Sequence, residues 1–552
     1  MKGNPKSVAA CLMRMLFPVL AVVTAASGIA AQSDSAPVDV DRRLQVMWDD
    51  AVIDVSASTA PRLVHHPEFA GTVMIHDKPW EGDGCNYHCL VTDYDVKGPL
   101  LRMYYNGVSG LTLAQLGGER RFSADGVRIC YAESRDGGIT WTKPELGIVD
   151  FKGSKANNCI IDKATFGWTL DNFFVFKDSR HGCPADELYK AVCLGDYEPM
   201  QDDWQPVPES AGAHAWKCKK VGGKMYERNL WCLVSADGIH FRKGWLMTRL
   251  GAFDSMNTAF WDATREVYHL YARGFHDIKP GSDGVRDVRH SVSKDFREWT
   301  NPERLDFGRD AEDGILYQLY TNQIQPYFRE ASIFVGFPVR YVERSAWTAN
   351  YDRLPSPDIR RRRVDRGSRR YGLAITECLF MFSRDGQRFY REDETFMRPG
   401  PENPDNWVYG DRYLAYPLLE APSPIGGDNE IAIYTGDCHA TGKAVRLQRY
   451  RLRQDGFVSR HAPFSGAKVV TKPLVFSGSE MLVNFSTSAR GGMTVTIRDG
   501  AGAGISSVTM FGDKVDRVVD FAHGGTVASF AGRPVVVEFD MKDADLYSFR
   551  FR

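Results

Sequence analysis

The chain has 552 residues, of which 43% are hydrophobic and 12% aromatic, with a formal net charge of -1 at pH 7. This length exceeds one ordinary hydrophobic core and predicts two or more domains, and the high aromatic, glycine and proline content is typical of a turn-rich all-β protein. The near-neutral charge argues against a nucleic-acid partner, because phosphate binding requires a surplus of Lys and Arg.

The N-terminus has the pattern of a secretory signal. Two lysines and Arg14 precede an apolar run over residues 16–26, and small residues follow as far as Ala31. This run is short for a membrane span, whereas a charged start, a short apolar core and a small-residue exit are typical of a signal peptide. We therefore predict a signal peptide over residues 1–31, a secreted or periplasmic bacterial location, and no membrane span once the signal is removed. A retained anchor is the alternative.

Five short stretches resemble one another and organise most of the chain. Each follows an apolar, β-prone run and places an Asp-containing turn before an aromatic residue. The stretches are 134–141, 235–241, 293–299, 383–389 and the weaker 453–457. Asp and Gly tolerate tight turns, and a repeated unit with irregular spacing is typical of a radial repeat rather than a solenoid. The five copies predict a five-bladed β-propeller over residues 45–464, with about four strands in each blade.

The first stretch reads Ser134-x-Asp136-x-Gly138-x-Thr140-Trp141, which is the Asp-box pattern of sialidases and other propeller glycosidases. The other copies are similar to the blade ends of the five-bladed glycoside hydrolases, which include invertase-like fructosidases, arabinanases and xylosidases. The resemblance covers about residues 45–552 at the level of the fold and implies a bacterial member of this superfamily. The box residues themselves are turn formers, so they predict the fold and not the reaction.

A different pattern follows the fifth stretch. Short strands divided by Gly- and Asp-rich turns predict a C-terminal β-sandwich over residues 465–552. A propeller followed by a sandwich is also the arrangement that the resemblance implies. The sandwich either binds glycan or covers the propeller flank, and we favour the structural role.

Candidate catalytic residues lie where the innermost strands of a propeller should begin, because these positions surround the tunnel mouth. Glycoside cleavage needs one carboxylic acid that protonates the leaving oxygen and a second carboxylate that acts as nucleophile or activates water. The predicted catalytic carboxylates are Asp77, Glu81, Asp254 and Glu377. Each also has a structural interpretation: Asp77 and Asp254 as turn residues, Glu81 as the partner of a nearby Lys or Arg, and Glu377 as part of an outer strand.

Polar and aromatic residues of the same segments are predicted to bind the sugar. Aromatic faces suit sugar rings, and guanidinium groups suit a substrate carboxylate. The predicted substrate-binding residues are Trp80, Tyr87, Asn158, Asp171, Asn257, Arg273, Asn322, Gln325, Tyr327, Arg340, Trp407 and Arg412.

The site segments depart from the fructosidase pattern. The Asn-Asp-Pro-Asn-Gly motif of that family is absent, and His76-Asp77-Lys78-Pro79-Trp80-Glu81 stands in the first blade instead. No Arg-Asp-Pro occurs in a middle blade, where Phe253-Asp254-Ser255 is found, while Glu377-Cys378 resembles the Glu-Cys pair that carries the acid. The resemblance is therefore specific for the fold and loose at the site.

No sequence motif supports a cofactor. Cys-x-x-Cys, His-Glu-x-x-His, phosphate-loop and dinucleotide patterns are all missing, so we expect neither a metal site nor a nucleotide. Ten cysteines remain after removal of the predicted signal, which permits disulfides in an oxidising compartment. Seven arginines over residues 360–370 indicate a solvated insertion loop, with a patch for an acidic polymer as the alternative.

The leading functional hypothesis is a secreted glycoside hydrolase that acts on an oligo- or polysaccharide, with carbohydrate as its only expected partner. A sialidase-like exo-glycosidase is the second enzyme hypothesis, prompted by the intact Asp-box. A non-catalytic glycan-binding propeller is the third, because the fold does not settle the function. The sequence gives no indication of the oligomeric state.

Overall fold

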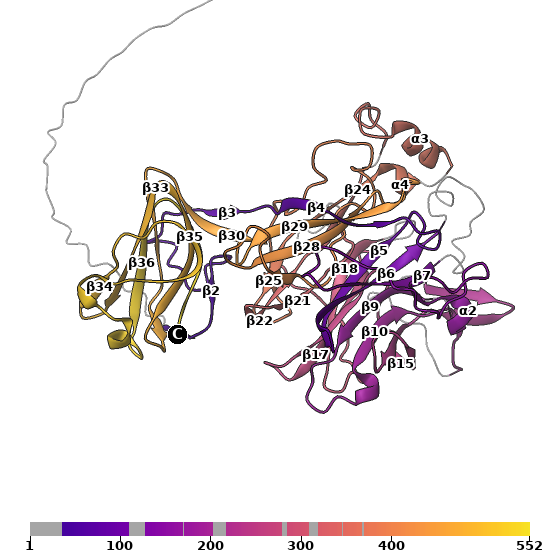
Figure 1. Ribbon diagram of the computed structural model, residues 1–552, viewed down its shortest axis with the longest axis horizontal. Coiled ribbons are helices and arrows are strands. Elements are labelled where there is room, and N and C mark those ends of the chain that lie inside the picture. Colours follow the sequence, from indigo (N-terminus) through magenta and orange to yellow (C-terminus); the bar gives the residue numbers. More distant parts are fainter. Residues whose placement is uncertain are drawn as a thin grey trace, which may run out of the picture.

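The computed structural model describes residues 36–109, 127–168, 170–202, 217–278, 284–308, 318–344, 346–366 and 369–552. This part of the protein is nearly all β, as the sequence predicts, and it forms a larger and a smaller lobe (Figure 1). The predicted signal peptide lies outside the described residues. Within the described ranges, no helix is both long and apolar enough to cross a membrane.

The larger lobe contains five antiparallel four-stranded sheets. The first consists of β5 (Asn86–Asp95), β6 (Gly98–Val108), β7 (Val127–Ser134) and β8 (Cys159–Ile161), and the second of β9 (Asp171–Lys177), β10 (Tyr189–Leu194), β14 (Leu230–Ser235) and β15 (Arg242–Thr248). The third consists of β16 (Thr258–Asp262), β17 (Val267–His276), β18 (Val285–Ser293) and β19 (Glu303–Arg304), and the fourth of β21 (Gln325–Tyr327), β22 (Glu330–Gly336), β25 (Met381–Ser383) and β26 (Phe389–Arg391). The fifth consists of β27 (Leu419–Ala421), β28 (Glu430–Asp437), β29 (Val445–Arg453) and β4 (Glu68–His76).

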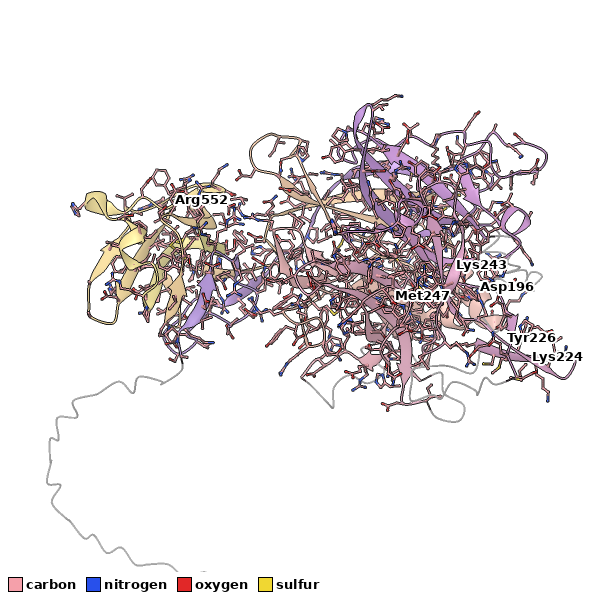
Figure 2. The ribbon with its side chains drawn as sticks, turned by 90° about the horizontal axis from the view of Figure 1, so that it is seen from below. Asp196, Lys224, Tyr226, Lys243, Met247 and Arg552 are labelled. Carbon is pink, nitrogen blue, oxygen red and sulfur yellow. The ribbon has the colours of Figure 1, made fainter. Side chains whose placement is uncertain are left out.

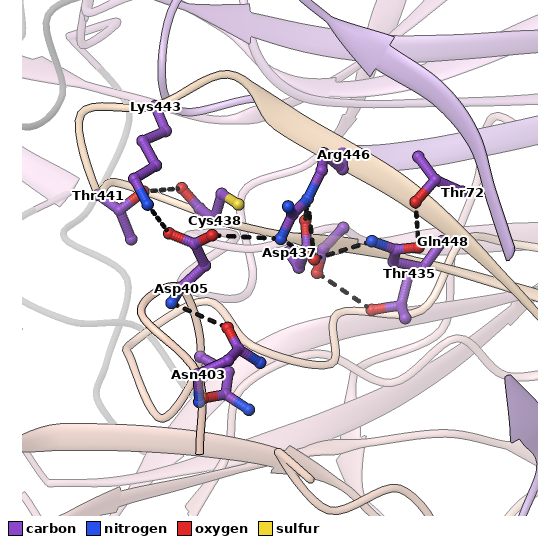
Figure 3. Close-up of polar contacts among 12 residues, drawn as sticks. Thr72, Asn403, Asp405, Thr435, Asp437, Cys438, Thr441, Lys443, Arg446 and Gln448 are labelled. Carbon is purple, nitrogen blue, oxygen red and sulfur yellow. Dashed lines mark hydrogen bonds and ion pairs between the residues drawn. The ribbon is translucent and has the colours of Figure 1, made fainter. Parts of the chain in front are cut away.

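The fifth sheet takes its last strand from the beginning of the lobe. β4 pairs antiparallel with β29, and the hydroxyl of Thr72 donates to the side-chain oxygen of Gln448 at 2.8 Å. At the end of the same hairpin, Arg446 bonds both Asp437 and Asp405 (Figure 3). These contacts join segments that are far apart in the sequence, so the lobe is closed by its own N-terminal strand.

The five predicted turn stretches occupy equivalent places. Each begins at or directly after the end of the third strand of its sheet, that is after β7, β14, β18, β25 and β29. In the first stretch the hydroxyl of Ser134 donates to Asp136 at 2.8 Å and accepts the N–H of Gly138 at 2.9 Å. The stretches that begin at Ser235, Ser293 and Ser383 repeat the serine–aspartate bond at 2.9, 3.0 and 3.1 Å. These bonds lie within a few residues, which explains why the sequence reveals them.

Two three-stranded sheets are inserted into the larger lobe. One contains β11 (Glu198–Pro199), β12 (Cys218–Val221) and β13 (Lys224–Glu227), whose tip at Lys224 and Tyr226 lies at the end of the molecule away from Arg552 (Figure 2). The other contains β20 (Gln318–Leu319), β23 (Val339–Glu343) and β24 (Ala374–Cys378), and it continues the strands of the fourth sheet.

The arginine-rich segment between β23 and β24 is not a solvated loop over its described residues. It forms α3 (Pro357–Asp365) and α4 (Arg369–Leu373), in addition to the single turn α2 (Lys163–Phe166) elsewhere. Arg360 and Arg363 are buried, and they donate to the backbone carbonyls of Trp407 and Ala440. Arginine side chains here anchor the insertion, because their guanidinium groups satisfy carbonyls that the helix covers.

The smaller lobe is one connected ten-stranded sheet around its own apolar core. Its strands are β1 (Val38–Asp41), β2 (Gln45–Val46), β3 (Arg62–Val64), β30 (Val458–Ala462), β31 (Ala467–Val470), β32 (Leu474–Phe476), β33 (Met481–Asp499), β34 (Gly504–Ser506), β35 (Asp513–Val518) and β36 (Val535–Phe551). Four of these strands lie outside residues 465–552, so the sheet extends beyond the predicted domain boundary.

Asp455 ties the lobes together. Its carboxylate accepts hydrogen bonds from Tyr327 at 2.6 Å, Asn484 at 2.9 Å and Ser548 at 2.5 Å, and its carbonyl accepts from Trp48 at 2.9 Å. All these side chains are buried. Together with the Arg329 guanidinium 3.4 Å away, these donors allow a charged group to be enclosed between the two cores.

Candidate functional site

Backbone strain marks one end of the five sheets. Of the eighteen described non-glycine residues with positive φ, five stand within the start of the first strand of a sheet or up to seven residues before it: Tyr87 (54°), Asn172 (56°), Phe253 (64°), Gln323 (41°) and Arg412 (62°). Such left-handed residues are costly and persist only where the surroundings hold them, and they gather at functional sites. The repeated strain therefore directs attention to the strand starts.

Asp171 and Asp254 lie close enough at this end for the charge of Asp254 to raise the pKa of Asp171. Asp171 is the first residue of β9, and Asp254 lies in the loop before β16. The side-chain amide of Asn172 donates to the carbonyl of Phe253 at 3.1 Å, so the neighbours of the two aspartates are directly bonded. Burial raises the pKa of Asp171, the charge of Arg228 opposes this, and the negative charge of Asp254 adds to it. We call the group Tyr87, Asp171, Asp254, Arg273 and Tyr320 the mouth site.

The carboxylate of Asp254 has no fixed protein partner. Among the described residues, no hydrogen bond or ion pair reaches it, although it is half-buried. Asp171 accepts only the backbone N–H of Asn172, at 2.8 Å. Half-buried carboxyl groups without cationic clamps are uncommon in structural roles and typical of groups that act on a ligand.

Tyrosines form the wall of the mouth site. The rings of Tyr87 and Tyr413 are stacked with centroids 6.1 Å apart, and Tyr413 stacks on Tyr320 at 5.6 Å. The hydroxyl of Tyr409 donates to that of Tyr320 at 2.6 Å. Burial raises the pKa of Tyr87, with the other tyrosines and the two aspartates adding to it. Aromatic faces next to polar hydroxyls are suited to the mixed apolar and polar faces of a sugar ring.

Arg273 enters the mouth site from β17. Its side chain is buried, its guanidinium lies 4.3 Å from the ring centroid of Tyr320, and it also donates to the carbonyl of Tyr320. Asn257 holds the backbone at this point, because its oxygen accepts the N–H of Arg273 at 2.9 Å while its amide donates to the carbonyl of Phe253 at 3.2 Å. Asn322 acts similarly one sheet further on, where it accepts from Thr258 at 2.8 Å. Both asparagines thus shape the strand starts.

Glu81 lies in a buried network away from these carboxylates. Its exposed fraction is 0%, and it accepts hydrogen bonds from Tyr105 at 2.7 Å, Lys143 at 2.8 Å and the N–H of Lys78 at 2.8 Å. Burial alone would raise the pKa of Glu81, but the bond to His76 and the charge of Lys143 lower it to about 2. Since burial also lowers the pKa of His76, we assign the positive charge to Lys143.

The other two predicted catalytic residues also lie apart from the mouth site. Asp77 is exposed, with 58% of its side chain accessible, and approaches Lys78 and Lys143 at 3.6 and 3.8 Å. Glu377 accepts from Arg340, its register partner across β23 and β24, at 2.9 Å. Of the four predicted catalytic carboxylates, only Asp254 has an electrostatic interaction with Asp171 among the described residues.

The remaining predicted binding residues are mostly occupied by protein contacts. Trp80 donates to Asn158 at 2.6 Å, Trp407 to the carbonyl of Gly400 at 2.9 Å, and Arg412 to the hydroxyl of Tyr450 at 2.6 Å. Gln325 accepts from the N–H of Leu418 at 2.9 Å, and Tyr327 is bound to Asp455 between the lobes. Tyr87, Asp171 and Arg273 are the predicted binding residues that reach the mouth site.

Sequence reasoning did not select Tyr320, Tyr409 or Tyr413. All three stand close to residues that were selected, Asn322 and Arg412, so the segments were found but the facing side chains were not. Within the described ranges, no group of three or more His, Cys, Asp or Glu side chains is placed to hold a metal ion. The ten described cysteines are free thiols.

Comparisons with known proteins give matches only at the level of structure. No protein-family model matches the chain, and no curated protein matches its sequence. An N-acetylgalactosamine deacetylase from F. plautii is 12% identical, with 75% of this chain and 95% of that chain covered and a TM-score of 0.36. A thermostable family-43 glycoside hydrolase is 10% identical (68% and 93% covered, TM-score 0.38), and a Bombyx mori GH32 beta-fructofuranosidase is 10% identical (91% and 96% covered, TM-score 0.36).

Glycoside hydrolases thus recur among the matched structures. At these scores no residue of this chain is paired with a residue of theirs. The roles of individual side chains therefore depend on the geometry of the mouth site itself.

Proposed function

We propose that the protein is a glycoside hydrolase whose five four-stranded sheets are the blades of a propeller and whose catalytic carboxyl groups are Asp171 and Asp254. The observation that carries this proposal is the carboxyl pair itself: two neighbouring half-buried groups, one with a raised pKa and the other without a protein partner. Acid–base catalysis requires two carboxyl groups whose protein environments differ in this way.

Each carboxyl group has a defined step. Asp171, whose pKa is raised by burial, acts in our proposal as the acid and donates its proton to the glycosidic oxygen as the C–O bond to the leaving sugar breaks. Asp254, as a carboxylate, either attacks the anomeric carbon or removes a proton from the water that attacks it. Tyr87 and Tyr413 provide the stacked aromatic surface against which the ring lies.

The propeller arrangement is supported by the repetition of parts. Five sheets of four strands each carry one of the five turn stretches after the third strand, and β4 completes the last sheet. Radial repetition of this kind leaves only short, protected sheet edges. The ten-stranded sheet covers its flank through Asp455, and in our proposal it is the structural companion of the propeller. Export with removal of residues 1–31 completes the proposal.

The decisive experiment measures release of reducing sugar from a panel of oligosaccharides by the purified protein, Asp171→Asn and Asp254→Asn. Each variant should lose at least about 100-fold in turnover, the lower end expected for a missing general acid or base. Asp186→Asn is the matched control, since this exposed aspartate pairs with Arg242 beyond the far end of β9. Normal activity in both variants would remove this assignment, and retention on a glycan column without turnover would favour the non-catalytic binding alternative.

A further inference from the structure

Two buried guanidinium groups, Arg273 of the mouth site and its neighbour Arg286, form no ion pair with an acidic side chain in the described ranges. Arg273 on β17 and Arg286 on the neighbouring β18 have exposed fractions of only 2% and 7%. Over the described ranges, neither forms an ion pair with Asp or Glu. The adjacent Asp287 is already held by Arg289 at 2.9 Å and His276 at 3.0 Å. The charge of Asp254 acts on Arg273 but forms no ion pair with it, so a ligand anion would supply the direct counter-charge that both buried guanidinium groups lack.

Stacking fixes the orientation of both groups. The guanidinium of Arg273 lies 4.3 Å from the centroid of Tyr320, and that of Arg286 lies 4.6 Å from the centroid of Tyr341. The two rings are 5.9 Å apart. Because the planar groups are held against rings, little rotamer freedom is lost when they bind, which is the advantage of a pre-organised site.

Each group also keeps a donor without an acceptor. Arg273 donates through Nη2 to the carbonyl of Tyr320 and Arg286 through Nη1 to Gln318, both neutral oxygens. The Nη1 of Arg273 and the Nε of Arg286 are buried without any hydrogen-bond partner. A buried donor that is left unpaired loses its hydration with no compensation, so an acceptor supplied by a ligand would stabilise both of these atoms.

We propose that Arg273 and Arg286 bind an oxyanion carried by the sugar, either the carboxylate of a uronic acid or a sulfate ester, which makes this protein selective for acidic glycans. Guanidinium forks match the paired oxygens of both groups. Arg273 belongs to the same mouth site as Asp254, which places the oxyanion on the reacting sugar or its neighbour. This inference rests on the proposed function, whose site it deepens.

The test measures binding of monosaccharide probes by isothermal titration calorimetry. The probes are glucuronate and galacturonate, glucose 6-sulfate and galactose 6-sulfate, and neutral glucose and galactose. At least one charged probe should bind about tenfold or more tightly than its neutral counterpart, and Arg273→Gln and Arg286→Gln should each weaken it about tenfold or more, as expected for hydrogen bonds to charged groups. Preference for the uronates or for the sulfates distinguishes the two sources.

Arg297→Gln is the matched control. Arg297 also stacks on an aromatic ring, at 3.8 Å from the centroid of Trp245, but it lies beyond the opposite end of β18. Binding should be unchanged in this variant. Equal affinity for charged and neutral probes in the wild type, or unchanged binding in both buried-arginine variants, overturns the inference.

Two further measurements keep the test decisive. If circular dichroism shows that the glutamine variants do not fold, Arg286→Lys replaces them, because it retains the charge but not the guanidinium fork. In the wild type, added NaCl should weaken the binding of the charged probes and leave the binding of glucose unaffected. Asp254→Asn should lose turnover without weakening the binding of the charged probe, because it removes a negative charge near Arg273. Hydrolysis of neutral oligosaccharides without preference for acidic ones would remove the selectivity and leave the hydrolase, whereas charged-probe binding without any turnover would remove the hydrolase and leave the oxyanion site.

Discussion

The side-chain amide of Asn172 donates to the backbone carbonyl of Phe253 at 3.1 Å, and this bond joins the two segments that carry the aspartates of the mouth site. Asn172 follows Asp171, and Phe253 precedes Asp254. Both bonded residues have left-handed backbones, with φ of 56° and 64°. The strain at each position is therefore held by the other, and the carboxyl pair is assembled by backbone geometry rather than by ion pairs.

Asn172→Gly tests this bond without adding backbone strain, because glycine accepts a positive φ as readily as asparagine does. We expect turnover to fall about fivefold and the unfolding free energy to fall by about 1 kcal/mol, the usual contribution of one hydrogen bond. Steady-state kinetics and denaturant unfolding measure both. Asn172→Ala should be worse, since alanine adds the cost of the left-handed backbone. Wild-type values for the glycine variant would show that the bond does not position the pair.

The raised pKa of Asp171 predicts a particular dependence on pH. As the general acid, Asp171 must be protonated, so kcat/KM should fall as the pH rises through its raised pKa. The raised pKa also affects stability. The contribution of Asp171 to the unfolding free energy is fully present below its unfolded pKa and is lost as the pH rises through its folded pKa.

Asp171→Asn removes the loss of unfolding free energy that ionisation of the buried Asp171 causes as the pH rises. The variant should therefore be more stable than the wild type at neutral pH, and the difference should vanish in acid below about pH 4, where the aspartate is protonated in both states. Thermal unfolding at a series of pH values measures it. A variant that is less stable than the wild type at pH 8 would show that the carboxylate form of Asp171 is the favoured one.

Glu81→Gln separates a structural from a catalytic role. Its pKa, lowered to about 2, gives stability that is present above the unfolded value near 4.5 and lost as the pH falls toward 2. The variant should lose about 3 kcal/mol or more at pH 7, as expected when a buried ion pair with Lys143 is broken, and less at pH 3. Asp77→Asn, on the exposed side of the same lysine, should cost less than about 1 kcal/mol. A catalytic Glu81 would show the reverse, with turnover lost and unfolding unchanged.

Asp455→Ala should uncouple the two lobes. Removing the carboxylate leaves the buried Tyr327, Asn484 and Ser548 without their acceptor, so we expect a loss of about 3 kcal/mol or more and separate unfolding of the two cores in calorimetry. Asp513→Ala is the control, because Asp513 is exposed and pairs with Arg453 at the surface. A single unshifted transition for Asp455→Ala would contradict the assigned role.

The sequence by itself determined the features whose contacts are local. The turn stretches at Ser134, Ser235, Ser293 and Ser383 close through hydrogen bonds within a few residues, so residue identity is enough to predict them and, through their repetition, the all-β class. The sequence also indicates the segments of the site, because polar residues interrupt apolar strands there. These segments carry Tyr87, Asp171, Asp254 and Arg273.

Only the tertiary structure decided which of these side chains act together. Glu81 and Asp171 stand in similar polar segments of the sequence. In the structure, Lys143 and Tyr105 enclose Glu81. The loop before β16 is bonded to the residue after Asp171 and brings Asp254 near it. Burial and the charge of distant neighbours fix a carboxyl pKa, and neither is visible in the local sequence. The pairing of β4 with β29 and the entry of β1–β3 into the ten-stranded sheet are likewise long-range, because backbone hydrogen bonds between strands carry no residue code that one sequence reveals.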